Sequence, residues 1–135
     1  MTIVDTNVLL DLVTDDERWF EWSLNAIETA AAEGPLLLNA VIYAELSARY
    51  EQLSEVDDFV AKANVQFADI PREAAFAAAK AFGEYRGGGG SKTGVLSDFF
   101  IGAHAAVLDV PILTRDMGRY RTYFPHVRLI APQIN

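Results

Sequence analysis

Short apolar runs alternate with amphipathic stretches along almost the whole chain, and this alternation limits the fold more than any other feature. The runs predict strands at 2–4, 36–38, 67–70, 110–113 and 127–130, and the intervening stretches predict helices at 6–13, 15–32, 40–50, 55–65, 71–87, 97–108 and 116–123. Apolar strands that alternate with helices are typical of a parallel sheet with helices on both faces. The predicted fold class is therefore α/β.

Polar residues mark several of the predicted helix starts. Asp15 and Asp16 suit the start of the second helix, Asn39 is a favourable N-cap for the third, and Ser97 is expected to cap the helix at 97–108. Gly34, followed by a proline, ends the second helix. We find no internal repeat and no linker, so residues 1–135 are expected to form a single domain.

The composition excludes several kinds of site. There are no cysteines, so disulfides, thiolate nucleophiles and cysteine zinc sites are excluded, and the two histidines are too few for a zinc site of several imidazoles. The N-terminus lacks the features of a signal peptide. No apolar run approaches the roughly 18 residues of a membrane span. We therefore expect a cytoplasmic protein that does not enter a membrane.

The net charge of −8 is unevenly distributed. Residues 1–85 hold 16 acidic and 5 basic residues, whereas residues 86–135 hold 3 acidic and 6 basic residues. Phosphate binding normally depends on Lys and Arg, so the overall charge does not favour a nucleic-acid partner. The basic C-terminal part nevertheless permits one local surface that binds a polyanion.

Four acidic residues stand where a functional site is expected. Asp5 ends the first predicted strand, and Asp116 closely follows the strand that ends at 113. Ligands of open α/β sheets bind beyond the carboxyl ends of the strands. Asp98 lies in the first turn of its helix, which favours an anion. Glu45 stands in an apolar helical stretch, where a charge is costly unless it has a partner.

Carboxylates that share one crevice repel each other, and a divalent cation relieves this repulsion. Hard oxygen ligands favour Mg²⁺ or Mn²⁺. Such an ion can bind a phosphate oxygen and present an activated water for in-line attack. The acidic residues therefore predict metal-dependent phosphodiester hydrolysis.

The same residues carry a resemblance that extends over nearly the whole chain. The sequence resembles the PIN-domain ribonucleases, and within them the VapC-type toxins of type II toxin–antitoxin pairs. The motifs are VDTN at 4–7, AEL at 44–46, LSDFFIGAHA at 96–105 and ILTRD at 112–116. Each motif alone is weak, but the four occur in the order and on the elements that the family requires.

The resemblance implies a single PIN-like domain with metal ligation by Asp5, Asp98 and Asp116, and with Glu45 completing the acidic site. It implies supporting roles for two polar residues, Asn7 and Thr114. It also implies endonucleolytic RNA cleavage with Mg²⁺ or Mn²⁺, a homodimer, and inhibition by an antitoxin whose tail enters the active-site groove. Some relatives carry another acidic residue two positions after the one matching Asp116. Here that position is Gly118.

Each acidic residue also has a structural interpretation. Asp5 could cap the following helix, Asp98 could compensate its helix N-terminus, and Asp116 could merely begin a helix. Glu45 could pair with Arg49, one helical turn along.

Basic residues in the C-terminal part are candidate RNA contacts. We expect phosphate contacts from Lys92, Arg115, Arg119, Arg121 and Arg128, the alternative being a solvated face. The glycine-rich segment 87–94 is predicted to be a loop, because it lacks the glycines of a P-loop and follows a helix. His104 is expected to be a packed helical residue.

The second predicted helix is broadly apolar. Trp19 and Trp22 lie on a stripe beside the core-facing one. A buried core accounts for most of this surface, and our hypothesis is that part of it receives the antitoxin, since aromatic anchors are typical of interfaces.

Three other functions share part of this pattern. A haloacid-dehalogenase-like phosphatase needs an acid two residues after Asp5, where Asn7 stands. A phosphoacceptor receiver needs paired acids at its first strand and a lysine after its last, and neither is evident. A non-catalytic PIN-like module would be expected to have lost some of the four acids. Cleavage of DNA stays open, because metal–carboxylate chemistry does not read the sugar.

Overall fold

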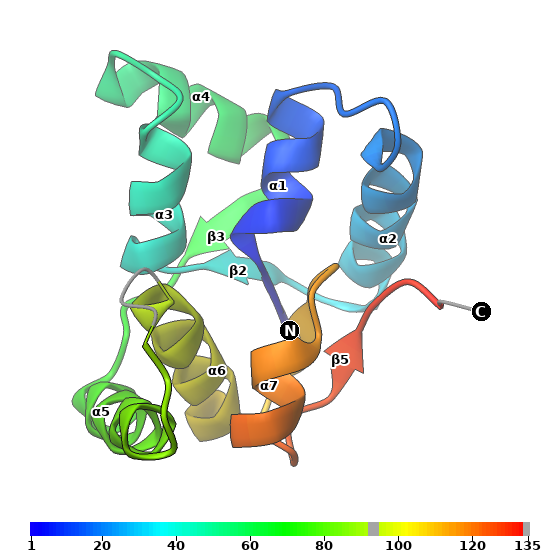
Figure 1. The fold of residues 1–135 in the computed structure, drawn as a ribbon. Coiled ribbons are helices and arrows are strands. Elements are labelled where there is room, and N and C mark those ends of the chain that lie inside the picture. Colours follow the sequence, from blue (N-terminus) through cyan, green and yellow to red (C-terminus); the bar gives the residue numbers. More distant parts are fainter. Residues whose placement is uncertain (92–94, 134–135) are drawn as a thin grey trace.

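A computed structural model of the chain describes residues 1–91 and 95–133. Its strands form one five-stranded parallel sheet (Figure 1). Its order is β3-β2-β1-β4-β5, and every neighbouring pair is parallel. The strands are β1 (Thr2–Val4), β2 (Leu36–Leu38), β3 (Val65–Phe67), β4 (Ile112–Leu113) and β5 (Leu129–Ile130). The predicted α/β class is confirmed.

Seven helices connect these strands within the described residues. They are α1 (Thr6–Val13), α2 (Phe20–Glu33), α3 (Ala40–Ser47), α4 (Leu53–Lys62), α5 (Arg72–Gly87), α6 (Leu96–Leu108) and α7 (Gly118–Tyr123). None of them combines the length and hydropathy that a membrane span requires. The glycine-rich loop predicted at 87–94 begins after α5, and its residues 92–94 lie outside the described part of the chain.

Besides the helix start at Asp116, which is described with the site, two predicted helix starts and one strand were wrong. The Asp16 carboxylate accepts hydrogen bonds from the backbone N–H groups of Arg18 and Trp19, so it stabilises a turn and α2 begins only at Phe20. Ser97 lies inside α6, not at its cap. The strand predicted at 67–70 lies at Val65–Phe67. Asn39, in contrast, caps α3 as predicted, since its Oδ1 accepts from the Ile42 N–H at 3.0 Å.

The core explains why the central strands read as continuous apolar runs. The three residues of β1 and the three of β2 are buried, because helices cover both faces of the sheet. His104 is buried in α6, as predicted, and its Nδ1 lies 3.1 Å from Asn39 Nδ2. Alanines of α5 pack closely against Phe99 of α6, and α6 in turn contacts α3 and α7.

The strand order places a crevice at one edge of the sheet. The chain moves outward from β1 through β2 to β3, then returns to the other side of β1 with β4 and β5. Helices α1 and α7 follow the carboxyl ends of β1 and β4, on the two sides of this reversal (Figure 1). Such a switch point is where ligands bind in open α/β sheets.

Candidate active site

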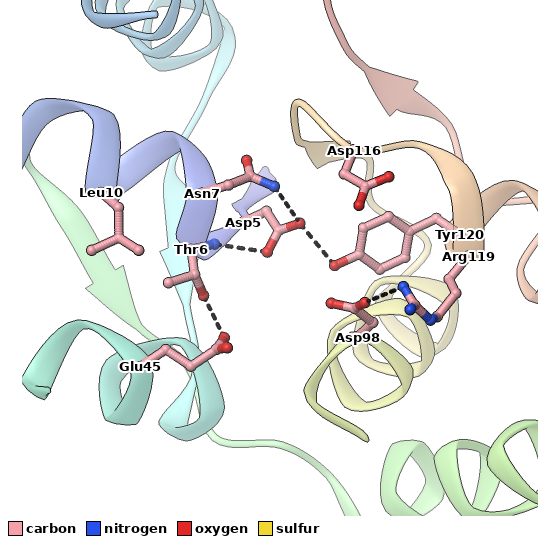
Figure 2. A pocket seen from close by; sticks show the side chains of 9 residues that line it. All are labelled: Asp5, Thr6, Asn7, Leu10, Glu45, Asp98, Asp116, Arg119 and Tyr120. Carbon is pink, nitrogen blue, oxygen red and sulfur yellow. Dashed lines mark hydrogen bonds and ion pairs between the residues drawn. The ribbon is translucent and has the colours of Figure 1, made fainter. Parts of the chain in front are cut away.

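A pocket of about 230 Å³ lies beyond the carboxyl ends of β1 and β4. Its walls come from α1, α3, α6 and the segment around α7, and its lining residues are Asp5, Thr6, Asn7, Leu10, Glu45, Asp98, Asp116, Arg119 and Tyr120. Figure 2 shows Asp5 in the middle, with Glu45 on the α3 side and Asp98 and Asp116 on the side of α6 and α7. The four acids named from the sequence therefore line one pocket.

Asp5 is the buried centre of the pocket. Asp5 is 5% exposed. It also caps α1, because its Oδ1 accepts a hydrogen bond from the Thr6 N–H at 2.7 Å. Its Oδ2 accepts from the hydroxyls of Thr114 at 2.8 Å and Tyr120 at 2.9 Å. Burial raises the pKa of Asp5 to about 6, and the neighbouring Asp98 adds to the increase, although the hydrogen bonds oppose it. The capping role and the pocket position are thus compatible.

Tyr120 was missed by the sequence analysis. It lies on α7, four residues after Asp116, and its ring is buried while its hydroxyl reaches the Asp5 carboxylate (Figure 2). Burial first, and then the charges of Asp5 and Asp98, raise its pKa well above the ordinary value, so the phenol stays a hydrogen-bond donor. The available signal was that a helix starting just after β4 directs its first turns toward the crevice.

Asn7 and Thr114 join the segments that follow β1 and β4. Asn7 Nδ2 lies 3.2 Å from Thr114 Oγ1 and 3.4 Å from Asp5 Oδ2, and Asn7 Oδ1 accepts from the Arg115 N–H at 3.1 Å. Thr114 Oγ1 also accepts from the Asp116 N–H at 3.0 Å. These contacts connect both residues to Asp5, and their supporting roles in the site stay a prediction.

The apolar surroundings expected for the Glu45 side chain were wrong. The residue is exposed, because it lies on the side of α3 that faces the pocket and not on the side that packs against the core. Its Oε1 accepts from the Thr6 hydroxyl at 2.6 Å, and its Oε2 lies 3.4 Å from the Ser97 hydroxyl. Apolar neighbours in the sequence did not mean apolar neighbours in space.

Asp98 and Arg119 form an ion pair at the wall of the pocket. Arg119 Nη1 lies 3.2 Å from Asp98 Oδ2, and the two side chains are 24% and 30% exposed. Burial raises the pKa of Asp98, Arg119 lowers it, and the charges of Glu45 and Asp116 raise it further. The direction that prevails is upward, because burial is the largest of these influences.

Asp116 stands in a turn and does not begin a helix. The prediction of a helix from 116 was wrong, because α7 starts at Gly118. The Asp116 carboxylate accepts from the Gly118 N–H at 3.1 Å and is otherwise exposed to the pocket mouth. Its backbone is held by Thr114, so the position of Asp116 is coupled to that of Asp5.

Arg115 points away from the pocket. Its guanidinium makes two hydrogen bonds to the buried Asp11, at 2.7 and 3.0 Å, and lies 4.9 Å from the centroid of the Trp19 ring. Asp11 also accepts from the Ser23 hydroxyl at 2.6 Å. Arg115 therefore ties the turn after β4 to α1 and α2, and this placement favours a structural role over the phosphate contact expected from the sequence.

The other candidate phosphate contacts are spread over the molecule. Arg121 is exposed on α7, and Arg128 is exposed just before β5. Arg128 lines hollows that do not include the four acids. Lys92 lies outside the described residues.

The donor set of the pocket fits a hard divalent cation. All four acids supply carboxylate oxygens, and burial, together with the charges of neighbouring acids, raises the pKa values of Asp5 and Asp98, an effect that a bound cation would oppose. Among the described residues, however, no three Asp, Glu or His side chains are already arranged to hold an ion. An ion would therefore have to draw these carboxylates together.

Comparison with known proteins decides the family. A sequence model of the PIN domain matches residues 2–125, which is most of the chain. The chain belongs to the PIN-domain family. PIN-domain nucleases are hydrolases that act on nucleic acids, and they generally use divalent metal ions. Among curated proteins, none matches this sequence.

Solved structures share the fold over nearly the whole chain. The chain is similar to a VapBC2 structure from Rickettsia felis bound to a promoter DNA fragment, with a TM-score of 0.74, 14% identity and 98% coverage of both chains. It is similar to VapBC-1 from nontypeable Haemophilus influenzae, with a TM-score of 0.71, 14% identity and 96% coverage of both. It is also similar to a toxin–antitoxin complex from Klebsiella pneumoniae, with a TM-score of 0.64, 20% identity and 98% coverage of both chains.

Proposed function

We propose that this PIN domain is a metal-dependent endoribonuclease and the toxin of a type II toxin–antitoxin pair. The observation that carries the proposal is the convergence of Asp5, Glu45, Asp98 and Asp116 on one pocket at the carboxyl edge of the sheet. These residues come from four separate segments, and a shared cavity for four acids has no evident structural purpose. A phosphatase loses its basis here, because the chain belongs to a different family.

Asp5, Asp98 and Asp116 would hold Mg²⁺ or Mn²⁺, with Glu45 completing the acidic site. When bound, the ion would supply a Lewis acid for a phosphate oxygen and lower the pKa of a water. The chain's own contribution is to orient Asp5. Thr114 and Tyr120 both donate to Oδ2, so Oδ1, which accepts from the Thr6 N–H, is the oxygen with more room for a cation.

RNA is the proposed substrate on the strength of the family resemblance. Arg119 lies at the pocket, and Arg121 on the same helix is exposed and free of a carboxylate contact among the ion pairs of the described residues. Both are proposed phosphate contacts, as is Lys92. Arg115 is proposed to act instead through its ion pair with Asp11.

An antitoxin is the proposed protein partner, because the similar structures are VapBC and toxin–antitoxin complexes. Trp19 and Trp22, whose rings meet edge to face at 6.1 Å, remain the proposed contact. Trp19→Ala and Trp22→Ala proteins that fold normally and bind the antitoxin undiminished would remove that contact. A cytoplasmic homodimer is proposed from the same family likeness.

The decisive experiment combines purified protein with structured RNA or single-stranded DNA, in Mg²⁺, Mn²⁺ or chelator. We expect RNA cleavage that needs the metal and leaves a 5′-phosphate. Asp5→Asn should abolish it, whereas Asp58→Asn, which removes an exposed acid on α4, should not. Cleavage that persists in chelator or in Asp5→Asn would overturn the proposal.

A non-catalytic PIN module is the second candidate. It is favoured by the finding that no three carboxylates among the described residues are already set to hold an ion. That module would bind RNA in the same experiment without cleaving it in either metal.

A further inference from the structure

Arg119 places a permanent positive charge among the pocket acids. It lies in the first turn of α7, and its guanidinium reaches across the pocket wall to Asp98 on α6 (Figure 2). The Asp98 carboxylate receives one hydrogen bond from it, Nη1 to Oδ2 at 3.2 Å. An arginine pairs most strongly when two of its N–H groups bind both carboxylate oxygens. Arg115, with its two bonds to Asp11, shows that arrangement in the same chain.

The remaining contacts leave the Arg119 guanidinium incompletely satisfied. Its Nε is buried and has no hydrogen-bond partner among the described residues. Its guanidinium carbon lies 5.9 Å from the centroid of the Tyr85 ring, and the face of an aromatic ring is a weak hydrogen-bond acceptor. A buried N–H without a partner is unfavourable. The observed position of Arg119 is thus one that a better acceptor would change.

A divalent ion and Arg119 would neutralise the same carboxylate. Asp98 is one of the acids proposed to hold the ion, and it is the one that Arg119 contacts. Two cations close to one carboxylate repel each other, so an ion bound at Asp98 would weaken the ion pair. The guanidinium, once released, matches the planar, two-oxygen geometry of a phosphate.

We propose that Arg119 is an internal counter-charge that holds Asp98 while no ion is bound, yields it to the ion, and then binds the RNA phosphate. This inference rests on the proposed function, since it assigns a partner and a sequence of contacts to that same site. Arg119 then competes with the metal ion for the Asp98 carboxylate and contributes to substrate binding.

Mn²⁺ binding without nucleic acid tests the competition. Mn²⁺ is titrated into metal-free protein at pH 7.5, and the free ion is measured by its EPR signal. We expect Arg119→Gln to bind Mn²⁺ about three- to fivefold more tightly than the wild type, because the ion no longer displaces a partly exposed ion pair. The matched control is Arg121→Gln, which removes the same charge from an exposed position on the same helix. It should change the affinity less than about twofold, as a screened charge does.

The Asp98→Asn variant distinguishes a failure of the proposed competition from a failure of the proposed metal site. We expect this variant to weaken Mn²⁺ binding, and we expect Arg119→Gln to give no tightening in the Asp98→Asn background. If Asp98→Asn weakens binding but Arg119→Gln matches Arg121→Gln, the competition is overturned while the metal site stands. If the wild type binds no Mn²⁺, the proposed metal site and the competition fail together.

RNA kinetics test the second half of the inference. At saturating Mn²⁺, Arg119→Gln should raise KM for RNA several-fold with a smaller change in kcat, because one phosphate contact is lost. An unchanged KM would overturn the phosphate contact and leave Arg119 only as the counter-charge of Asp98.

Discussion

The inner side of the pocket and its rim are built differently. On the inner side, Asp5 is buried and accepts hydrogen bonds from three neighbouring segments, and Thr114 and Asn7 are joined to each other as well. On the rim, Glu45 and Asp116 are exposed and Asp98 is partly exposed; each is held by one or two neighbours.

The difference indicates which carboxylates are positioned in advance and which can move. The inner carboxylate is fixed by several hydrogen bonds, whereas each rim carboxylate has fewer contacts to break when an ion approaches. This division accounts for a pocket that collects four acids without a ready-made group of three. It predicts large effects for changes on the inner side and small effects on the rim.

The largest expected effect is the pH dependence of stability caused by Asp5. Its pKa is raised from 3.8 to about 6 in the folded chain, so the folded state binds more protons than the unfolded state between these values. The free energy of unfolding should therefore fall as the pH rises through this window, by up to about 3 kcal/mol from this group.

Urea unfolding in chelator between pH 4 and pH 7.5 measures this effect. Asp5→Asn lacks the ionisable group, so its stability should fall less over the same range. Asp98 contributes in the same direction in both proteins, and Asp5→Asn removes only the part of that contribution that comes from the Asp5 charge. Parallel pH profiles of the wild type and Asp5→Asn would show that Asp5 is not held in a desolvated position.

The second effect concerns the ion pair that supports the inner side. Arg115→Gln would leave the Asp11 carboxylate buried with Ser23 as its remaining hydrogen-bond donor among the contacts described. We expect a loss of about 2 kcal/mol in the free energy of unfolding, less than for a fully buried pair because Arg115 is 26% exposed. Urea unfolding at pH 7.5 measures it.

A matched control for this prediction is Arg121→Gln, whose side chain is exposed on α7. Its stability should stay close to that of the wild type. If the two variants unfold alike, Arg115 does not tie the turn after β4 to α1.

The third effect compares one hydroxyl on each side of the pocket. Tyr120→Phe removes a buried donor to Asp5 and should lower the free energy of unfolding by about 1 kcal/mol and RNA cleavage by roughly tenfold. Ser97→Ala removes a long contact to Glu45 on the rim and should change both far less. Urea unfolding and initial cleavage rates give the two readouts; equal effects of the two substitutions would contradict the comparison.

The smallest expected effect is that of a new acid on the rim. Gly118→Asp restores the carboxylate that some relatives carry, and a Cβ at this position would lie 3.4 Å from Asp116 Oδ1, which is ordinary contact. We expect a modest tightening of Mn²⁺ binding, about twofold, because a mobile carboxylate adds little to a rim that can already adjust. Titration followed by EPR measures it, and a weaker affinity would show that the rim acids cannot accommodate another charge.

Local patterns in the sequence were sufficient for most of the fold. β1 and β2 were predicted with the observed bounds, because buried parallel strands are apolar throughout, and β2 also follows the turn signal of Gly34 and Pro35. Asn39 was recognised as a cap because a cap acts within one turn of its helix. Asp5, Asp98 and Asp116 were found because strand ends and helix starts converge at one edge of a parallel sheet, whereas Glu45 was found as a charge in an apolar stretch and through the family resemblance.

Contacts between distant residues were beyond these patterns. The exposure of Glu45 depended on which side of α3 packs against the core. The late start of α2, in contrast, results from local hydrogen bonds of Asp16 that favour a turn over the helix. The partners of Arg115 and Arg119 are 104 and 21 residues away in the chain, and Tyr120 lies 115 residues from Asp5.

The sequence by itself determined the alternation of strands and helices, the family likeness and the acids that would share a site. Tertiary structure alone decided which acid is buried, which arginine faces the pocket and which hydroxyls hold Asp5. The physical reason is that propensity and capping act over a few neighbouring residues, whereas burial and ion pairing depend on the distances between segments brought together by the fold.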